Sequence, residues 1–427
     1  MRKVLMVAFH YPPWSGGSGV HRTLKFTKYL PECGWQPIVL TASHQAYVNN
    51  GAQASPIPDG GVEVARAFAL DSARHLSIRG IYPRWLALPD RWISWWLGAM
   101  VVGRRLIKRH APDVIWSTYP IATAQLIGLS LHRSSGIPWV ADFRDPMTEI
   151  DPQTGEEFPE DPTIRRFNGF IERPTLEHCS RAVFTTPGTL AMYKSRFPEI
   201  PESRWGVIAN GYDEEDFAAA ERDLPPRSPR AGPAVLVHSG VLYPVARDPT
   251  AFFAALSELR RSGKISPQIV KIVLRACGFE ELYRPQLRAL GIDDIVFMEP
   301  AISHHESLVE MLNADGLLIF QASNCNWQIP AKLYEALRAG RPIFAMTDRK
   351  GDTAAVLMSE GVRTIASLDS KDEIAQGLLA FLASAKSGSN EVTPVRRNSR
   401  RARTQQLADL LNSIVSDSVA TQSRGGY

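Results

Sequence analysis

Short apolar runs alternate with amphipathic stretches along this chain of 427 residues. The first apolar run extends from Lys3 to Phe9, a helical pattern follows from about Val20 to Leu30, and a second run covers Gln36 to Ala42. Runs of this length are typical of strands buried on both faces, and their order opens a doubly wound parallel sheet. The pattern therefore predicts the α/β class. Further strand-like runs occupy residues 113–118, 138–143, 181–186 and 205–210.

The stretch from Pro225 to Pro233, PPRSPRAGP, interrupts this pattern. Its four prolines, mixed with arginine, serine and glycine, are typical of a linker between domains. The alternation of strand and helix patterns then starts again. We therefore predict two Rossmann-like doubly wound domains that face each other across a cleft, residues 1–222 and 235–385, with a linker over 223–234. Residues 386–427 read as a polar tail with one further helical pattern, from Arg400 to Val415.

Composition narrows the class further. No apolar run approaches the roughly 20 residues that a membrane-spanning helix needs. The four cysteines stand far apart without a CxxC pair, which argues against a disulfide framework or a zinc site and favours a reducing, cytoplasmic compartment. The net charge of +4 suits an anionic ligand without defining one.

A glycine-rich loop, PPWSGGSG, follows the first strand and precedes the first helix. Glycines such as Gly16 and Gly17 let backbone N–H groups approach an anion, and the helix N-terminus favours negative charge. The spacing matches neither GxGxxG nor a Walker loop. The alternative is a turn without a ligand.

The segment DFRDP places Asp142 and Asp145 at the end of a predicted strand, where ligands bind in parallel sheets. Either carboxylate is a candidate catalytic group, because it can accept a proton or orient a hydroxyl. The alternative is a local cluster of aspartate and arginine that caps the next loop.

The second half carries two candidate donor-binding segments. In HSGVLYPVARD, Gly240 ends a strand and Arg247 stands near the next helix, an arrangement that suits a diphosphate. In QIPAKLYEALRAGRP, a short helix carries Lys332, Leu333 and Glu335, and we assign these three to the same site. The carboxylate can accept hydrogen bonds from vicinal hydroxyls, and the helix N-terminus can face a phosphate. The alternative is an exposed glutamate on an amphipathic helix.

Tryptophans crowd one helical stretch, at Trp92, Trp95 and Trp96, and basic residues follow it at 104–109. Such a helix can lie on a membrane surface, at the inner face of the membrane. A core-facing stripe followed by solvated arginines explains the same spacing and is the favoured interpretation.

Several of these segments together resemble a family 4 glycosyltransferase of the two-Rossmann (GT-B) architecture. The resemblance rests on FHYPPWSGGSGVHR, DVIWSTYP, VADFRDP, IANGYDEEDF, LVHSGVLYPVARDP and QIPAKLYEALRAGRPI, in this order along nearly the whole chain. It implies retaining transfer of a sugar from a nucleotide-sugar donor to a glycan or lipid-linked acceptor, with no metal, no other cofactor and no nucleic acid. It also implies that the last helix packs back on the first domain.

Residue by residue, the resemblance puts Gly16 and Gly17 near the donor diphosphate and gives Arg247 a diphosphate-binding role. Glu335 matches the second glutamate of an E-x7-E motif, which holds the donor ribose. Trp327 stands where that motif has its first glutamate, near the donor sugar.

Asp142 or Asp145 falls close to a polar catalytic position that is often histidine in the family. Two other activities fit the same scaffold, a nucleotide-sugar 2-epimerase and a non-catalytic nucleotide-sugar-binding subunit. Trp327, in place of the first motif glutamate, favours the non-catalytic subunit. A dehydrogenase is disfavoured by the glycine spacing and by the second Rossmann-like half.

Overall fold

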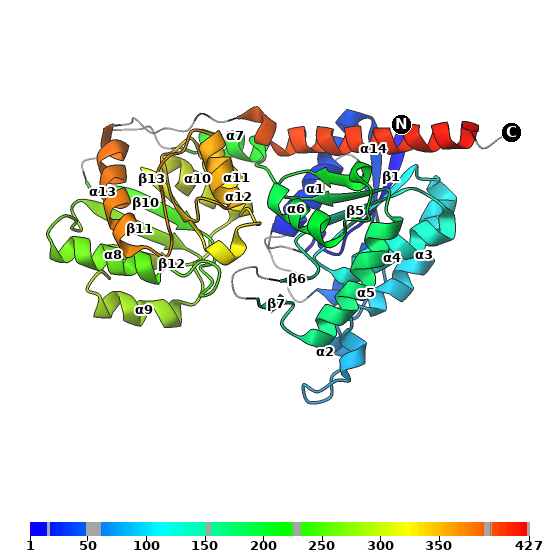
Figure 1. Ribbon diagram of the computed structural model, residues 1–427, viewed down its shortest axis with the longest axis horizontal. Helices are drawn as coiled ribbons and strands as arrows, with labels where there is room; N and C mark the ends of the chain where they lie inside the picture. Colours follow the sequence, from blue (N-terminus) through cyan, green and yellow to red (C-terminus); the bar gives the residue numbers. More distant parts are fainter. Residues whose placement is uncertain are drawn as a thin grey trace. The chain divides into compact units, whose positions relative to one another are not determined.

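The computed structural model describes residues 1–14, 18–47, 61–150, 155–224, 232–387, 393 and 395–424 (Figure 1). The chain forms two compact units. Unit 1 comprises Met1–Asn210 with Arg400–Tyr427, and unit 2 comprises Gly211–Ser399. The predicted linker falls mainly on residues 225–231, which lie outside the described residues.

Unit 1 is built on a seven-stranded sheet in the order β3-β2-β1-β4-β5-β8-β9, and all of its neighbouring strands are parallel. A separate antiparallel pair, β6 and β7, follows β5. The strands are β1 Arg2–Val7, β2 Trp35–Ala42, β3 Glu63–Ala67, β4 Val114–Thr118, β5 Trp139–Arg144, β6 Glu149–Ile150, β7 Glu157–Phe158, β8 Arg181–Phe184 and β9 Trp205–Val207.

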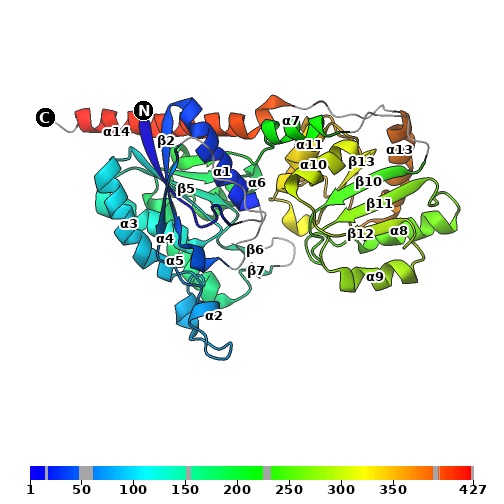
Figure 2. The ribbon, with the colours of Figure 1, turned by 180° about the vertical axis from the view of Figure 1, so that it is seen from behind.

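Helices cover both faces of this sheet. The core on one face combines β-strand side chains with α1 and with Leu407, Leu411 and Ile414 of α14, and both views show α14 running alongside α1 (Figures 1 and 2). Helices α3, α4 and α5 pack side by side in series. The helices are α1 Ser18–Tyr29, α2 Ser72–His75, α3 Ser94–His110, α4 Ala122–Ser135, α5 Pro162–His178, α6 Pro187–Arg196 and α14 Arg400–Arg424, with 3-10 turns η1 Leu30–Cys33, η2 His44–Ala46, η3 Arg84–Ala87 and η4 Glu202–Arg204.

Unit 2 has a six-stranded parallel sheet in the order β12-β11-β10-β13-β14-β15. Its strands are β10 Ala234–Ser239, β11 Val270–Arg275, β12 Val296–Glu299, β13 Gly316–Gln321, β14 Ile343–Thr347 and β15 Ile365–Ala366. Its helices are α7 Glu214–Arg222, α8 Thr250–Arg261, α9 Glu280–Ala289, α10 His304–Asn313, α11 Ala331–Ala339, α12 Asp352–Ser359 and α13 Lys371–Ser387, with 3-10 turns η5 Ser323–Cys325 and η6 Arg396–Asn398.

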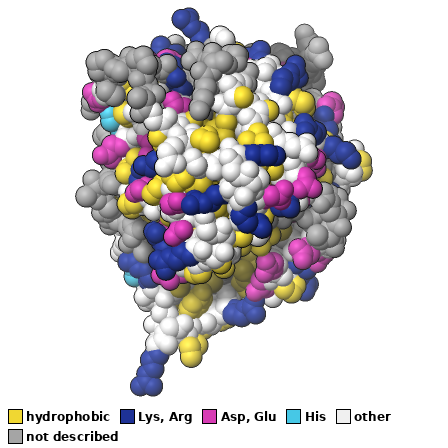
Figure 3. All heavy atoms as spheres, turned by 90° about the vertical axis from the view of Figure 1, so that its left-hand side faces the viewer, with side chains coloured by type: hydrophobic (Ala, Val, Ile, Leu, Met, Phe, Trp, Pro, Cys, Tyr) yellow, Lys and Arg dark blue, Asp and Glu magenta, His cyan; other side chains and the backbone are white. Residues whose placement is uncertain are grey.

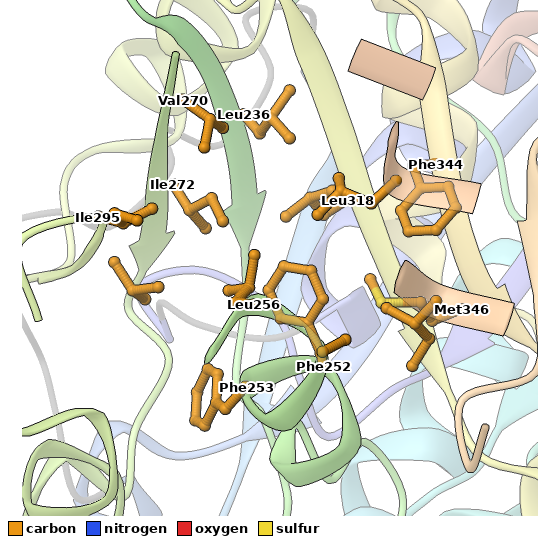
Figure 4. Close-up of a cluster of buried hydrophobic side chains, with 14 of the residues drawn as sticks. Leu236, Phe252, Phe253, Leu256, Val270, Ile272, Ile295, Leu318, Phe344 and Met346 are labelled. Atoms are coloured by element: carbon orange, nitrogen blue, oxygen red, sulfur yellow. The ribbon is translucent and has the colours of Figure 1, made fainter. Parts of the chain in front are cut away.

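One hydrophobic core of unit 2 lies between its sheet and the helices α8, α9 and α13. Leu236, Ile272 and Leu318 of neighbouring strands meet Phe252 and Leu256 of α8 (Figure 4). Both sheets thus have the continuous apolar strands that burial on two faces requires. The α/β class with two Rossmann-like units is confirmed.

Helix α7 belongs to unit 2, whereas the sequence-based bounds put residues 211–222 with the first domain. Helix α7 packs against α10 with Phe217 buried, and Arg338 on α11 donates hydrogen bonds of 2.9 Å to Glu214 and to Glu221 at the two ends of α7. Because these contacts join α7 to α10 and α11, the unit boundary lies between Asn210 and Gly211.

Helix α3 contributes a core stripe. Trp95 is buried, Trp92 donates its ring N–H to Ala46 O at 3.3 Å, and Trp96 donates to Ser130 Oγ at 3.0 Å. The tryptophans that suggested a membrane helix are therefore engaged inside unit 1. Across the described residues, no helix is both long and apolar enough to cross a membrane.

Candidate active site

The carboxyl ends of β1, β4 and β5 meet at one edge of the unit 1 sheet, where parallel sheets bind ligands. Polar residues follow each strand: His10 after β1, Tyr119 after β4 and Asp145 after β5. Burial, and then the nearby Asp145 carboxylate, raise the pKa of Tyr119, so its hydroxyl stays protonated. This edge is the candidate acceptor-side site.

Asp142 points into the protein rather than toward a ligand. Its carboxylate is fully buried and receives two hydrogen bonds from Arg22 of α1, at 2.8 and 3.0 Å, and one from Thr118 Oγ1 at 2.9 Å. Arg22 also donates to Ala209 O at 3.2 Å. A carboxylate with these partners ties α1 to β5 and shapes the edge. The geometry favours a structural role for this residue, although its arginine partner comes from α1 and not from the local DFRDP cluster that the sequence suggested.

Asp145 has the opposite environment. It is exposed, and it follows a bulge in β5 at which Arg144 adopts φ 59°. A non-glycine residue in this left-handed region costs roughly 1 kcal/mol or more and is held only by its surroundings. The backbone N–H of Asp145 donates to Phe143 O at 2.6 Å, which turns its side chain out of the strand. Of the two predicted aspartates, Asp145 is the one available to a ligand.

A buried polar network fixes the segment that follows Asp145. Glu172 of α5 is 1% exposed and accepts from Thr148 N at 3.2 Å, from Thr148 Oγ1 at 2.7 Å and from Arg196 Nη2 at 2.8 Å. Tyr193 donates its hydroxyl to the same carboxylate and accepts from Met147 N at 3.0 Å. A buried carboxylate with several donors is strongly held, so these bonds fix Met147 and Thr148 against α5 and α6.

His10 is a residue that sequence reasoning passed over. Burial, and then the charge of Arg144, lower the pKa of His10 to about 4, so the imidazole is neutral at pH 7. Gly19 approaches both residues closely: a Cβ there would lie 2.7 Å from Arg144 Nη1 and 3.3 Å from His10 Nδ1, so a side chain would require the Arg144 guanidinium to shift. The one sequence feature that could have identified His10 is its position, directly after the first apolar run. Gly16 and Gly17 lie outside the described residues.

In unit 2, the carboxyl end of β10 meets the N-terminus of α11. Lys332 Nζ donates to Ser239 Oγ at 2.8 Å, and Ser239 Oγ lies 3.0 Å from Ser307 Oγ of α10. Gly240 follows with φ 143°, a conformation that favours glycine. An ammonium group, two hydroxyls and a glycine backbone thus lie together beside a helix N-terminus, which is a suitable environment for phosphate oxygens.

Arg247 lies in the loop between β10 and α8. Its guanidinium donates to Val241 O at 3.3 Å and to Gln321 Oε1 at 3.5 Å, and it lies 5.9 Å from the ring centroid of Tyr243. Burial lowers its pKa from the ordinary value, which still leaves arginine charged. The charge therefore stands at the same edge of the sheet as Gln321 at the end of β13.

Glu335 lies one turn into α11 and faces α10. His304 Nε2 is 3.1 Å from Glu335 Oε1, and both side chains are partly exposed. Leu333 has a different environment, because its side chain is fully buried in the unit 2 interior. If Leu333 contacts the donor, as predicted, its backbone and not its side chain makes the contact. Trp327 is half-buried in the segment that precedes α11.

His238 at the end of β10 was also not predicted. It is buried, its Nδ1 lies 2.9 Å from Leu318 O, and burial lowers its pKa to about 4. Within the described part of the chain, no group of three or more His, Cys, Asp or Glu side chains is placed to hold a metal ion. The titratable side chains at the candidate donor site include Arg247, Lys332, Glu335 and His304.

Comparison with known proteins gives the class. Residues 16–211 match the model of the family described as a glycosyl transferase 4-like domain. Similar solved structures include a trehalose 6-phosphate synthase from Burkholderia multivorans, at 12% identity, 99% and 98% coverage of this chain and that one, and TM-score 0.64. HepE from Anabaena, in complex with UDP and glucose, is 16% identical, with 97% of this chain and 100% of that chain covered and a TM-score of 0.58. The lipopolysaccharide outer core galactosyltransferase WaaB is 12% identical, with 96% of this chain and 99% of that chain covered and a TM-score of 0.57.

At such identities these structures establish a shared fold, while the matched domain carries the family. No curated protein sequence matches the chain significantly. Residues 16–211 therefore form a glycosyl transferase 4-like domain, and the chain as a whole shares the fold of these solved structures. The resemblance drawn from the sequence motifs is confirmed at this level.

Proposed function

We propose that the protein transfers a sugar from a nucleotide-activated donor to a glycan or lipid-linked acceptor in surface polysaccharide synthesis, with retention of anomeric configuration and without a metal. Unit 2 binds the donor, and the edge of unit 1 that carries Asp145 and His10 receives the acceptor. The observation that carries the proposal is the grouping of Ser239 and Gly240, at the end of β10, around Lys332, which stands about one turn before Glu335 on α11.

Each side chain of the donor site then has a chemical role. The ammonium of Lys332 and the guanidinium of Arg247 stabilise the charge that develops on the departing diphosphate, together with the N-terminus of α11. The carboxylate of Glu335 accepts hydrogen bonds from the vicinal hydroxyls of the ribose. His304 orients that carboxylate from α10.

The unit 1 edge supplies polar groups without a dedicated nucleophile. Neutral His10 and the exposed Asp145 contact hydroxyls of the acceptor or of the donor sugar, while the Asp142–Arg22 pair holds the edge in shape. The similar structures act on or bind different compounds, since their names include UDP, glucose, trehalose phosphate and lipopolysaccharide. The acceptor therefore has to be found by assay, and fold alone does not give it.

A thermal-shift panel of nucleotide-sugars tests the proposal. A ligand that binds only the folded chain at about a hundredfold excess over its Kd stabilises that chain by about 2.7 kcal/mol. We expect at least one nucleotide-sugar to raise the Tm and the corresponding free sugar to have no effect. Product formation that requires an added acceptor separates a transferase from a 2-epimerase. A panel in which no nucleotide-sugar shifts the Tm contradicts the proposal.

A further inference from the structure

A tight hairpin at one end of unit 1 exposes two isoleucines. Ile78 N donates to Ile81 O at 2.9 Å and Ile81 N donates to Ile78 O at 3.1 Å, so that only Arg79 and Gly80 form the turn. Both have positive φ, at 53° and 81°, as a two-residue hairpin turn requires. The hydrogen-bonded ring makes the turn rigid. Ile78 is 80% exposed and Ile81 is 78% exposed.

A tryptophan continues this apolar surface. Trp85 in η3 is 70% exposed, and its neighbour Arg84 forms an ion pair with Asp161, which caps the N-terminus of α5. The η3 turn is therefore fastened to unit 1 while the indole remains in solvent. Single exposed hydrophobic residues are common, but three large ones within eight residues of a projecting segment form a distinct surface.

We name this surface the hairpin tip and define it by Ile78, Arg79, Ile81, Arg84 and Trp85. In both ribbon views the segment beyond α2 projects away from the unit 1 sheet (Figures 1 and 2). On the face drawn in Figure 3, basic, acidic and hydrophobic side chains intermingle.

The charged residues within the hairpin tip itself are arginines, and Asp161 from outside the tip pairs with one of them, Arg84. Residues 72–89 include Arg74, Arg79 and Arg84 and contain no aspartate or glutamate. An arginine between two isoleucines can bury its stem while its head stays at the level of phosphates, and tryptophan favours the same interface. A convex tip of isoleucine, tryptophan and arginine fits a lipid surface, since a protein partner needs a pocket into which such a tip inserts.

We propose that the hairpin tip docks unit 1 on a membrane that contains anionic lipids, with Ile78, Ile81 and Trp85 entering the headgroup region. This moves the membrane contact from Trp92, Trp95 and Trp96 to a different segment. The inference rests on the proposed function for its purpose, which is access to a lipid-linked acceptor. Its physical basis is independent of that function.

The test is co-sedimentation of the full chain with vesicles of phosphatidylcholine, with and without phosphatidylglycerol, at low salt. We expect binding to the anionic vesicles that weakens as salt rises. The double variant Ile78→Ser, Ile81→Ser should bind at least about tenfold more weakly, because two apolar side chains no longer leave water. Arg79→Glu should lower binding to anionic vesicles roughly fivefold or more.

A matched control removes two other exposed apolar side chains of unit 1. Leu97 and Val101 of α3 are 62% and 53% exposed, and Leu97→Ser, Val101→Ser should bind vesicles like the wild type. Equal binding of the two double variants overturns the proposal, as does equal binding to both kinds of vesicle. Self-association that depends on the two isoleucines, without vesicle binding, also overturns it and assigns the tip to a second copy of the chain.

The nucleotide-sugar thermal shift separates this inference from the proposed function. The hairpin tip lies in unit 1, so Ile78→Ser, Ile81→Ser should keep the wild-type thermal shift with donor. Vesicle binding by a chain that no nucleotide-sugar stabilises would leave the docking surface intact and reject the proposed function. Donor binding without vesicle binding would support the proposed function and reject the docking surface.

Discussion

His304 Nε2 lies 3.1 Å from Glu335 Oε1, so the carboxylate assigned to the donor ribose is already held by an imidazole from the neighbouring helix. The contact fixes the position of Glu335 before a ligand arrives, which lowers the ordering cost of binding. It also gives the site a titratable group near neutral pH.

The His304–Glu335 pair predicts a pH-dependent contribution to stability. Burial alone would lower the pKa of His304, but the hydrogen bond and charge of Glu335 outweigh it and raise the pKa above 6.5. A raised folded-state pKa gives stability that is complete below the unfolded pKa and is lost as pH rises through the folded pKa. Because both side chains are partly exposed, we expect less than about 1 kcal/mol.

Urea unfolding of wild type and His304→Gln measures this contribution. The difference in unfolding free energy between the two should be larger below about pH 6 than above about pH 9. In a Glu335→Gln background the same substitution should show no such pH dependence. A difference that stays constant across this range contradicts the pairing.

The two aspartates of DFRDP should respond in opposite ways. Asp142→Asn weakens a buried, doubly hydrogen-bonded partner of Arg22, so we expect a loss of about 3–5 kcal/mol of unfolding free energy. Asp145→Asn changes an exposed side chain and should alter stability by no more than about 0.5 kcal/mol while it lowers the transfer rate. Unfolding titrations and transfer assays of both variants measure this, and a stable Asp142→Asn protein disagrees with it.

Strand patterns predicted most of the fold because parallel strands buried on both faces are continuous apolar runs, as in β1, β2 and β13. The edge strand β3 escaped prediction, since Glu63 and Arg66 interrupt its apolar residues. The unit boundary differs from the predicted one because α7 packs on α10 and pairs its charges with α11, and no local pattern reveals contacts between segments so far apart in the sequence.

The candidate donor site was more predictable than the acceptor side. Gly240 follows a strand end, and Lys332 and Glu335 sit in the first two turns of a helix, where local rules apply. The direction of Asp142 depends on Arg22, which is 120 residues away, and the partner of Glu335 comes from another helix. The capping box of Ser303 and Glu306 marks the start of α10 but not what His304 faces.

The last helix should stabilise unit 1. Leu411 of α14 is fully buried in the core that α1 and β1 share, so Leu411→Ala should cost about 2–5 kcal/mol through the cavity it leaves. Ser413→Ala, an exposed substitution on the same helix, is the control and should change stability by less than about 0.5 kcal/mol. Equal Tm values for the two variants in thermal unfolding would show that α14 does not contribute to the core.

The most direct test of the donor site is a calorimetric titration of wild type, Glu335→Gln and Glu281→Gln with the nucleotide-sugar that gives the largest thermal shift. Glu281 is an exposed glutamate on α9 and serves as the matched control. Hydrogen bonds to a charged group contribute about 1.5–3 kcal/mol each, so we predict that Glu335→Gln binds the donor roughly ten- to a hundredfold more weakly. Glu281→Gln should bind like the wild type, and all three proteins should retain the same fold. Equal donor affinity for the wild type and Glu335→Gln would contradict the account, because Glu335 would then be an exposed helix residue without a role in donor binding.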